Sequence, residues 1–331
     1  MGIWRKLGVT AGVVVVPLYL LNASWLAAPS PARPILIAQR GVHQVYDPKG
    51  VDNATCTARR IPPPTHDLID NTLPSIGAAF KAGADVVEVD MRQTRDGQFV
   101  LFHDLSLDCR TDGHGLVVEH TLAELKRLDV GYGYTPDAGR SFPLRGKGMG
   151  KMPTLEAALR AFPDRRFLLQ FKDGAPKIAD VMIRYLESRG LADWGRLSFF
   201  GGAAPVSRLA MLRPQARTWT QKGMVSCAVG YLGLGWTGYV PGACRKGVIV
   251  VPVNLRVLVW GWPNRFLERM RRADVQVLMI GDLSRTGGGE FSRLDSEDQL
   301  RQLPTHFDGA IWTDHIERIG PAARRRWPTT G

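Results

Sequence analysis

The chain has 331 residues, and 43 lysines and arginines outnumber 31 aspartates and glutamates, which gives a formal net charge of +12. This length is sufficient for one large α/β barrel domain, which typically needs about 250 residues. The charge suits an anionic partner, either a phosphorylated substrate or a lipid surface, and ordinary basic surface chemistry is the alternative of equal weight. No recognisable nucleic-acid-binding module is present, so we expect no nucleic-acid partner.

The N-terminal segment has the composition of a membrane anchor. Residues 1–6 are short and basic, and residues 7–28 contain no charged side chain. That length spans a bilayer, and the positive flank predicts a cytoplasmic N-terminus with the remaining domain outside the cytoplasm, in the periplasm or the extracellular space. A cleaved signal peptide is the alternative, because Ala27-Ala28 resembles a processing site, and the protein would then be secreted. Residues 29–34 are predicted to be a linker.

Four cysteines agree with an exported chain. Three pairings are possible. We favour Cys56 with Cys109 and Cys227 with Cys244, because each pair would close a loop at one rim of a barrel. Zinc binding is disfavoured, since the close Cys-x-x-Cys or Cys-His spacing of zinc sites is absent from the sequence.

From residue 35 onward, short apolar runs alternate with helical patterns. Such alternation predicts right-handed βαβ units and a parallel sheet, and about eight units close into a barrel. Residues 42–70 and 106–150 are polar stretches, the second predicted to cross the barrel mouth, and residues 321–331 form a basic tail. The strands are predicted at 35–39, 86–90, 166–171, 197–200, 218–220, 248–253, 275–280 and 310–313, and the helices at 73–82, 121–128, 155–162, 179–189, 263–272 and 296–303.

The chemistry is predicted to centre on the stretch 86–104. Glu88 and Asp90 are two residues apart, so in a strand both carboxylates share one face. Asp96-Gly97 is a two-residue hairpin signal that pairs positions whose numbers sum to 193 and places His103 opposite Asp90. The sequence therefore predicts a hard-cation site beside an imidazole that transfers a proton.

Several motifs together resemble the glycerophosphodiester phosphodiesterase family, of the phospholipase-C-like phosphodiesterase superfamily. Gly-Ala-Asp-Val-Val-Glu-Val-Asp precedes Thr-x-Asp-Gly, Phe-His-Asp and Arg-Thr-Asp-Gly, as in that family. Ile35-Leu-Ile-Ala-Gln-Arg-Gly41 stands at the family's His-Arg-Gly motif, and Asn71-Thr72 stands at its Glu-Asn-Thr motif with Asp70 in place of Glu. Later landmarks at 152–156, 167–172 and 307–314 follow in order, so the resemblance covers about residues 35–320.

The resemblance implies a (β/α)8 barrel and metal-dependent hydrolysis of a glycerophosphodiester or lysophospholipid, in which a neighbouring glycerol hydroxyl attacks phosphorus. It implies a calcium or magnesium ion held by Glu88, Asp90 and Gln170, with His103 as an acid or base. The further site residues that it implies for catalysis or phosphate binding are Gln39, Arg40, Lys172, Trp312 and His43.

Two positions depart from the family pattern. Gln39 stands at the first catalytic histidine, and a glutamine amide cannot transfer a proton near neutral pH. Gln170 stands at the third acidic ligand, where its carbonyl can still bind a hard cation with one charge fewer. The alternative function is therefore an impaired barrel that binds phosphorylated head groups without turnover. The head group, the choice of metal and the oligomeric state are not predicted.

Overall fold

The computed structural model describes residues 15–30, 32–48, 50–51, 55–283 and 291–328. Its centre is a sheet of eight parallel strands in the order β6-β5-β4-β2-β1-β9-β8-β7, and an additional strand, β3, pairs antiparallel with β2. Among the described residues no strand ladder joins β6 to β7, so the barrel is nearly closed, and the predicted α/β barrel is confirmed to that extent. The strands are β1 (Ile35–Gln39), β2 (Val86–Gln93), β3 (Phe99–Leu101), β4 (Arg166–Phe171), β5 (Leu197–Gly201), β6 (Arg217–Trp219), β7 (Val248–Pro252), β8 (Gln276–Ile280) and β9 (Ala310–Thr313).

The strand registers separate an inner face from an outer face. On the inner face Ile37, Leu168 and Trp312 belong to one buried apolar cluster, while the alternate residues of the same strands pack against the helices. Polar residues take the inner face at the carboxyl ends, where Gln39 lies beside Glu88 in the ladder between β1 and β2. An apolar layer inside the barrel therefore supports a polar layer at its mouth, where barrel enzymes place their chemistry.

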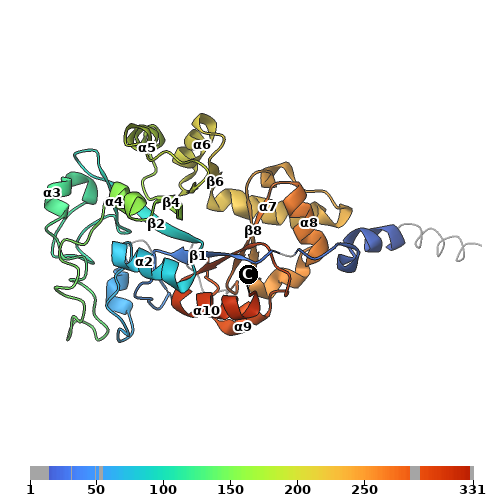
Figure 1. The fold of residues 1–331 in the computed structure, drawn as a ribbon, viewed down its shortest axis with the longest axis horizontal. Helices are drawn as coiled ribbons and strands as arrows, with labels where there is room; N and C mark the ends of the chain where they lie inside the picture. The colour runs from blue at the N-terminus through green and yellow to red at the C-terminus, as the bar shows by residue number, and fades with distance from the viewer. Residues whose placement is uncertain (1–14, 31, 49, 52–54, 284–290, 329–331) are drawn as a thin grey trace, which may run out of the picture.

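Helices connect and surround the strands (Figure 1). Local capping sets several of their ends, as in the helix after Thr154, whose hydroxyl accepts from the Ala157 amide, and in the helix that ends at Gly83 in the left-handed conformation. The α-helices are α2 (Leu73–Ala82), α3 (Leu122–Leu125), α4 (Leu155–Ala161), α5 (Lys177–Ser188), α6 (Ala203–Leu212), α7 (Gln221–Leu234), α8 (Asn264–Arg272), α9 (Glu297–Arg301) and α10 (Ile316–Arg326). The 3-10 helices are η1 (Ser24–Leu26), η2 (Thr57–Arg60), η3 (Val117–Glu119), η4 (Gly235–Thr237), η5 (Gly242–Cys244) and η6 (Val253–Leu258).

The hairpin between β2 and β3 forms, but the predicted register is wrong by one residue. Arg92 pairs with Val100, so the paired numbers sum to 192 rather than 193. The reason is a three-residue loop: the Thr94 amide donates to the Gln98 carbonyl, and Gly97 supplies the left-handed φ of +74°. His103 therefore does not lie opposite Asp90; Phe102 does, and its amide donates to the Asp90 carbonyl at 3.0 Å.

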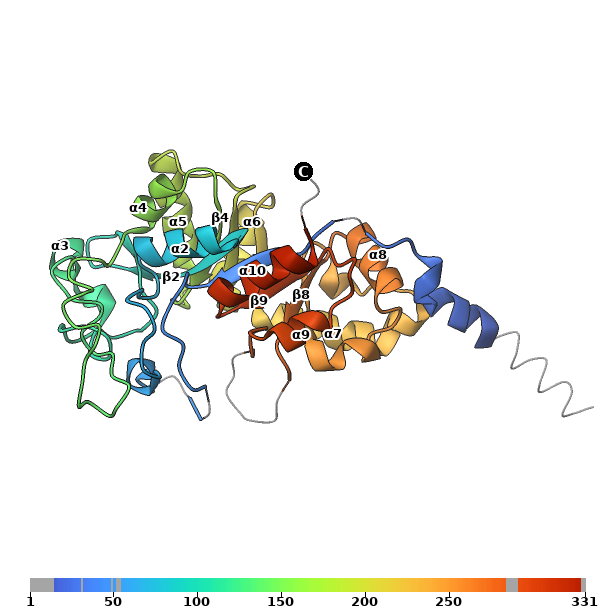
Figure 2. The ribbon, with the colours of Figure 1, turned by 60° about the horizontal axis from the view of Figure 1, so that its bottom comes forward.

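The polar stretch 106–150 packs on a small apolar core of its own next to the barrel. Leu107, Leu125 and Tyr134 are fully buried in this core together with Phe102. The Cys56–Cys109 disulfide joins the stretch to the loop that follows β1, and Cys227–Cys244 joins α7 to η5, so both predicted pairings are confirmed. Figures 1 and 2 place this stretch, which carries α3, at one end of the molecule, and α7 and α8 at the other.

The first and last segments that the structure describes both contact the domain. Residues 7–14 of the predicted anchor lie outside the described residues; residues 15–22 are helical, and no helix in the described ranges is long and apolar enough to cross a bilayer. At the other end, residues 321–326 belong to α10 rather than to a tail. Ala322 and Ala323 are buried there, and α10 packs beside α2. The prediction of a basic tail from residue 321 was wrong, because the apolar face of this helix is short and is followed by three arginines.

Candidate active site

Two neighbouring strands, β2 and β4, bring three oxygen-bearing side chains together at the barrel mouth. Glu88 and Asp90 share the inner face of β2, and Asp90 pairs with Gln170 of β4. The Gln170 amide lies 2.7 Å from Asp90 Oδ1 and 3.1 Å from Glu88 Oε1, and it donates to both when its nitrogen faces them. With its oxygen turned to the same side instead, Gln170 adds a third oxygen beside those of Glu88 and Asp90, a donor set that suits a hard cation. The structure thus brings all three predicted metal ligands together.

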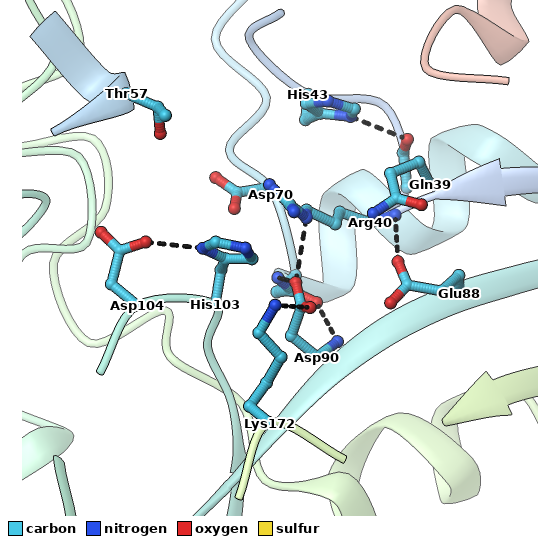
Figure 3. A network of polar contacts seen from close by, with 12 residues as sticks. Gln39, Arg40, His43, Thr57, Asp70, Glu88, Asp90, His103, Asp104 and Lys172 are labelled. Atoms are coloured by element: carbon cyan, nitrogen blue, oxygen red, sulfur yellow. Dashed lines mark hydrogen bonds and ion pairs between the residues drawn. The ribbon is translucent and has the colours of Figure 1, made fainter. Parts of the chain in front are cut away.

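Two cations lie against the same carboxylates. Arg40 Nε is 3.0 Å from Asp90 Oδ2, its backbone amide donates to Glu88 Oε2, and Lys172 Nζ is 3.4 Å from Asp90 Oδ1 (Figure 3). Arg40 reaches this place from a sharp turn, with its own φ at +53° and that of Gly41 at +84°. A side chain at Gly41 would collide with the Ser75 backbone, which explains the glycine.

This surrounding charge separates the two acids. Burial raises the pKa of Asp90, but Lys172 and Arg40 more than offset it and hold that pKa well below its usual range. Glu88 lies farther from the cations. Burial and the Asp90 charge raise the pKa of Glu88 to about 8, so without a bound cation it is protonated at neutral pH.

His103 lies beside this group and is held by a neighbouring acid. Its Nδ1 is 2.7 Å from Asp104 Oδ1, whereas its buried Nε2 has no hydrogen-bond partner within the described ranges. Burial, followed by the Arg40 charge, lowers the pKa of His103 to about 4. The imidazole is therefore neutral at pH 7. With Asp104 accepting from Nδ1, the Nε2 lone pair is free to accept a proton.

Arg110 is a site residue that the sequence reasoning missed. Its guanidinium donates to Asp104 Oδ2 at 2.9 Å, to Asp70 Oδ1 at 3.0 Å and to the Thr57 hydroxyl at 2.7 Å, and it also contacts Tyr134. It therefore fixes the acid that orients His103. Asp70 accepts hydrogen bonds from Arg110 and from the Tyr134 hydroxyl, so its carboxylate belongs to the same network. The Arg-Thr-Asp-Gly motif was the signal that could have pointed to Arg110.

Arg293 is a second missed residue. It donates from Nη2 to Gln39 Oε1 at 3.3 Å, and its guanidinium lies 4.1 Å from the centre of the Trp312 ring. Trp312 itself is 1% exposed inside the barrel and packs edge-on against Phe200, so it supports Arg293 from below. No local sequence pattern predicts the role of Arg293, because it contacts Gln39 of β1 across a separation of more than 250 residues.

The predicted residue His43 lies on the other side of Arg40 from His103 (Figure 3). Its Nδ1 is 3.4 Å from the Gly41 carbonyl and its Nε2 is 3.9 Å from Asp314 Oδ1. Burial lowers the pKa of His43, although the nearby Asp314 charge opposes this, so the ring is a neutral group at physiological pH.

Glu88, Asp90 and Gln170 fit a divalent cation as a mixed set of two carboxylates and one amide. Within the described ranges no three His, Cys, Asp or Glu side chains are grouped to hold a metal, because one of the converging side chains is an amide. The fit rests on the converging oxygens of Glu88, Asp90 and Gln170, and on the raised pKa of Glu88, whose carboxylate a nearby cation would stabilise.

Comparisons with known proteins agree with this arrangement. Residues 59–184 match the model of the glycerophosphoryl diester phosphodiesterase family. The chain is 38% identical over 97 residues to the glycerophosphodiester phosphodiesterase of Bacillus subtilis, which is 28% of this chain and 31% of that protein. It is 32% identical over 123 residues to the glycerophosphodiester phosphodiesterase of Caldanaerobacter subterraneus, which is 36% of this chain and 47% of that one. The chain thus matches less than half the length of these curated relatives.

Solved structures extend the likeness of fold over most of the chain. The glycerophosphoryl diester phosphodiesterase domain of Rv2277c from Mycobacterium tuberculosis has a TM-score of 0.61 at 18% identity, and the match covers 88% of this chain and 99% of that one. A glycerophosphodiester phosphodiesterase from Agrobacterium tumefaciens has a TM-score of 0.57 at 18% identity, with 87% and 98% covered. The chain is therefore similar to the glycerophosphoryl diester phosphodiesterase family over residues 59–184, and it shares its fold with solved glycerophosphodiester phosphodiesterases over most of its length.

Proposed function

We propose that this protein is a metal-assisted phosphodiesterase that cleaves glycerophosphodiesters. The observation that carries the proposal is the neutral His103, whose Nε2 has no protein partner in the described ranges and which lies beside Arg40, Lys172 and a cluster of three oxygens. A base, a phosphate-attracting pair and a cation site are the parts that phosphodiester cleavage needs. A related structure from Oleispira antarctica, with a TM-score of 0.54 at 19% identity, holds the product sn-glycerol-3-phosphate.

In the proposed reaction, His103 acts as a base. Its Nε2 accepts the proton of a glycerol hydroxyl, the hydroxyl oxygen forms a bond to phosphorus, and the bond from phosphorus to the leaving alcohol breaks. The products are a cyclic phosphate and an alkoxide that takes up a proton. Arg40 and Lys172 bind the non-bridging phosphate oxygens. Glu88, Asp90 and Gln170 would hold the divalent cation, calcium or magnesium, which supplies further positive charge at the phosphate when bound.

Position 39 holds no group that could protonate the leaving alcohol, because Gln39 carries an amide. Gln39 accepts a hydrogen bond from Arg293, so we propose that it positions this cation next to the phosphate instead of transferring a proton. His43 is the nearest second imidazole, and it lies beside Asp314. The alternative of binding without turnover follows directly if neither His43 nor solvent protonates the leaving group at a useful rate.

One observation favours a lipid substrate as a second candidate. An open groove of about 640 Å³ lies between the end of β5 and the start of α7, and its lining is mainly apolar. Gly201 forms one wall, next to the strand end that precedes Lys172, and Val225 and Val229 form the other. A single acyl chain suits such a groove, so lysophospholipid is the second substrate class to test.

We also propose that the domain lies outside the cytoplasm and is anchored by residues 7–28. The support is the absence of charge in that segment, the positive flank of Arg5 and Lys6, and two disulfides that persist in oxidising compartments.

Turnover of glycerophosphocholine, glycerophosphoethanolamine and lysophosphatidylcholine, with and without EDTA, tests the proposal. We expect cleavage that EDTA suppresses and that His103→Gln lowers by roughly 10² to 10⁴. The exposed His114→Gln serves as a matched control and leaves the rate unchanged. If no substrate is turned over, but calorimetry shows binding of glycerol 3-phosphate that Lys172→Met abolishes, the protein is a phosphate-binding protein and the enzyme proposal is wrong.

A further inference from the structure

Large apolar side chains are exposed along one helix at the end of the molecule opposite α3. The outward positions of α7 and η4 carry Val225, Val229, Leu232 and Trp236, which recur at helical spacing. The segment Val257–Trp260 adds three more exposed apolar side chains next to them, and Val229 and Leu258 are 63% and 61% exposed. We call this set the α7 face. An exposed apolar patch of this kind marks an interaction surface.

Both indole nitrogens of the α7 face are hydrogen-bonded. Trp260 donates from its indole nitrogen to the Leu232 carbonyl at 2.8 Å, and Trp236 donates to the Gly233 carbonyl at 3.1 Å. The Cys227–Cys244 disulfide braces the buried side of α7. Both indole rings can therefore enter an apolar phase without leaving an unpaired N–H donor, which suits tryptophans at a membrane interface.

The N-terminal segment is clamped directly onto the elements beside this face. Arg269 of α8 donates to the Asn22 side chain at 3.1 Å and to the Leu21 carbonyl at 2.7 Å, and Asn22 donates to the Trp236 carbonyl at 2.7 Å. Ser24 caps the start of α8 by accepting from its first amide. Figures 1 and 2 both show the N-terminal helix next to α8 at this end. The chain is thus fixed to the domain before residues 29–34, so these residues do not act as a spacer.

The N-terminal helix is itself apolar on its exposed sides. Val15, Val16, Tyr19 and Leu20 are all exposed, and Trp25 just beyond the helix is 68% exposed. A helix that exposes apolar residues on all sides is more stable in contact with lipid than in water. Because this helix is clamped to α8 and η4, lipid around it also meets the α7 face.

The charge around the α7 face is complementary to anionic lipid. From residue 218 to residue 267 the sequence contains no aspartate or glutamate, but it contains Lys222, Arg245, Lys246 and Arg256, and also Arg265, which pairs with Glu268 at 3.0 Å. Clustered cations near an apolar surface attract anionic head groups. A docking site for a second copy of the chain would need no such bias in charge.

We propose that the α7 face is a bilayer-docking surface, which holds the barrel directly on the membrane beside its N-terminal segment. The proposal concerns the folded domain and does not depend on the proposed reaction. It also puts the groove next to Val225 and Val229 at the lipid surface.

Quenching of tryptophan fluorescence by brominated lipid tests the proposal with the full chain in vesicles of phosphatidylcholine and phosphatidylglycerol. We expect strong quenching in the wild type and a clear loss of the quenched signal in the double variant Trp236→Phe and Trp260→Phe. Trp194→Phe is the matched control, since this residue packs against Phe199 and Arg213 on another side, and it leaves the quenched signal unchanged. If the double variant retains the full quenched signal, the proposal is wrong.

A second pair of variants tests docking itself. Leu232→Glu with Leu258→Glu should lower the share of molecules with the α7 face inserted at least ~10-fold, because a carboxylate in the acyl region loses its hydration. Met211→Glu, at an exposed position on α6, is the control and changes nothing. Unchanged quenching in the Leu232/Leu258 variant overturns the proposal. A detergent-resistant dimer that this variant dissociates, without quenching in the wild type, assigns the face to a second copy and also overturns it.

Discussion

The replacement Gln39→His tests whether the site lacks only a proton-transfer group. Gln39 is 4% exposed at the end of β1, beside Glu88 in the ladder, and an imidazole has a similar size. Regaining one acid or base group is worth roughly 10² to 10⁴ in rate. Against this, the hydrogen bond from Arg293 to Gln39 is lost, and a bond to a charged group contributes about 1.5–3 kcal/mol, or roughly 10- to 10²-fold.

The two effects together leave an expected rise in kcat on glycerophosphodiesters of roughly 10-fold, and at most about 10³-fold, with little change in metal affinity. The assay is release of choline from glycerophosphocholine at saturating metal. Gln39→Asn is the matched control, because it keeps an amide, weakens the contact to Arg293 by shortening the side chain, and adds no proton-transfer group. It should only lower the rate.

His43 provides the internal check on this reasoning. If His43 already protonates the leaving group, the wild type is active, His43→Gln lowers kcat, and Gln39→His adds little. An inactive wild type that stays inactive after Gln39→His, with unchanged metal binding and melting temperature, would refute the proton-transfer argument and favour binding without turnover.

Three further changes probe the metal site, the base and the rim. Because burial and Asp90 raise the pKa of Glu88 to about 8, cation binding at pH 7 should release about one proton. For the same reason the affinity for the cation should fall about 10-fold for each pH unit below 8. Calorimetry in buffers of different ionisation enthalpy measures the proton release, which Glu88→Gln should abolish. Asp104→Asn should lower kcat by about 10² or more with little change in KM, because His103 loses the acceptor that fixes its tautomer; a purely structural role would instead change the melting temperature. Loss of Cys56–Cys109, which closes a loop of 53 residues, should lower the free energy of unfolding by about 4 kcal/mol, as followed by urea denaturation of the Cys56→Ser variant with its partner also replaced.

The sequence predicted most strands and the composition of the mouth because both depend on local patterns. Period-two alternation put Glu88 and Asp90 on one face, and the ladder places Gln170 against Asp90 as expected. Helix α2 was predicted to its last residue, since Pro74 and Gly83 mark its two ends. Helix α7 was not predicted, because three glycines interrupt its helical composition and only packing and a disulfide compensate.

The parts that were missed depend on distances along the chain or on small shifts in a turn. Arg293 enters the site through a contact that no short pattern encodes, whereas Arg110 lies in the Arg-Thr-Asp-Gly motif and only its contact with Asp104 was missed. The hairpin register was wrong because Gly97 closes a three-residue loop, although the sequence gives the same Asp-Gly signal for a two-residue loop. His103 nevertheless reaches the site, since the chain leaves the ladder after Leu101 and the position of His103 is set by Asp104.

The two glutamines at the mouth change its charge in the same direction. Where the family resemblance implies an acid at position 170, Gln170 removes a negative charge, and the interaction at Gln39 places Arg293 beside the site. With Arg40 and Lys172 also present, cations outnumber the ionised carboxylates even when Glu88 is charged. Such a site attracts phosphate strongly and a divalent cation weakly. Cation affinity and phosphate affinity should therefore respond in opposite ways to Gln170→Glu, the first rising and the second falling.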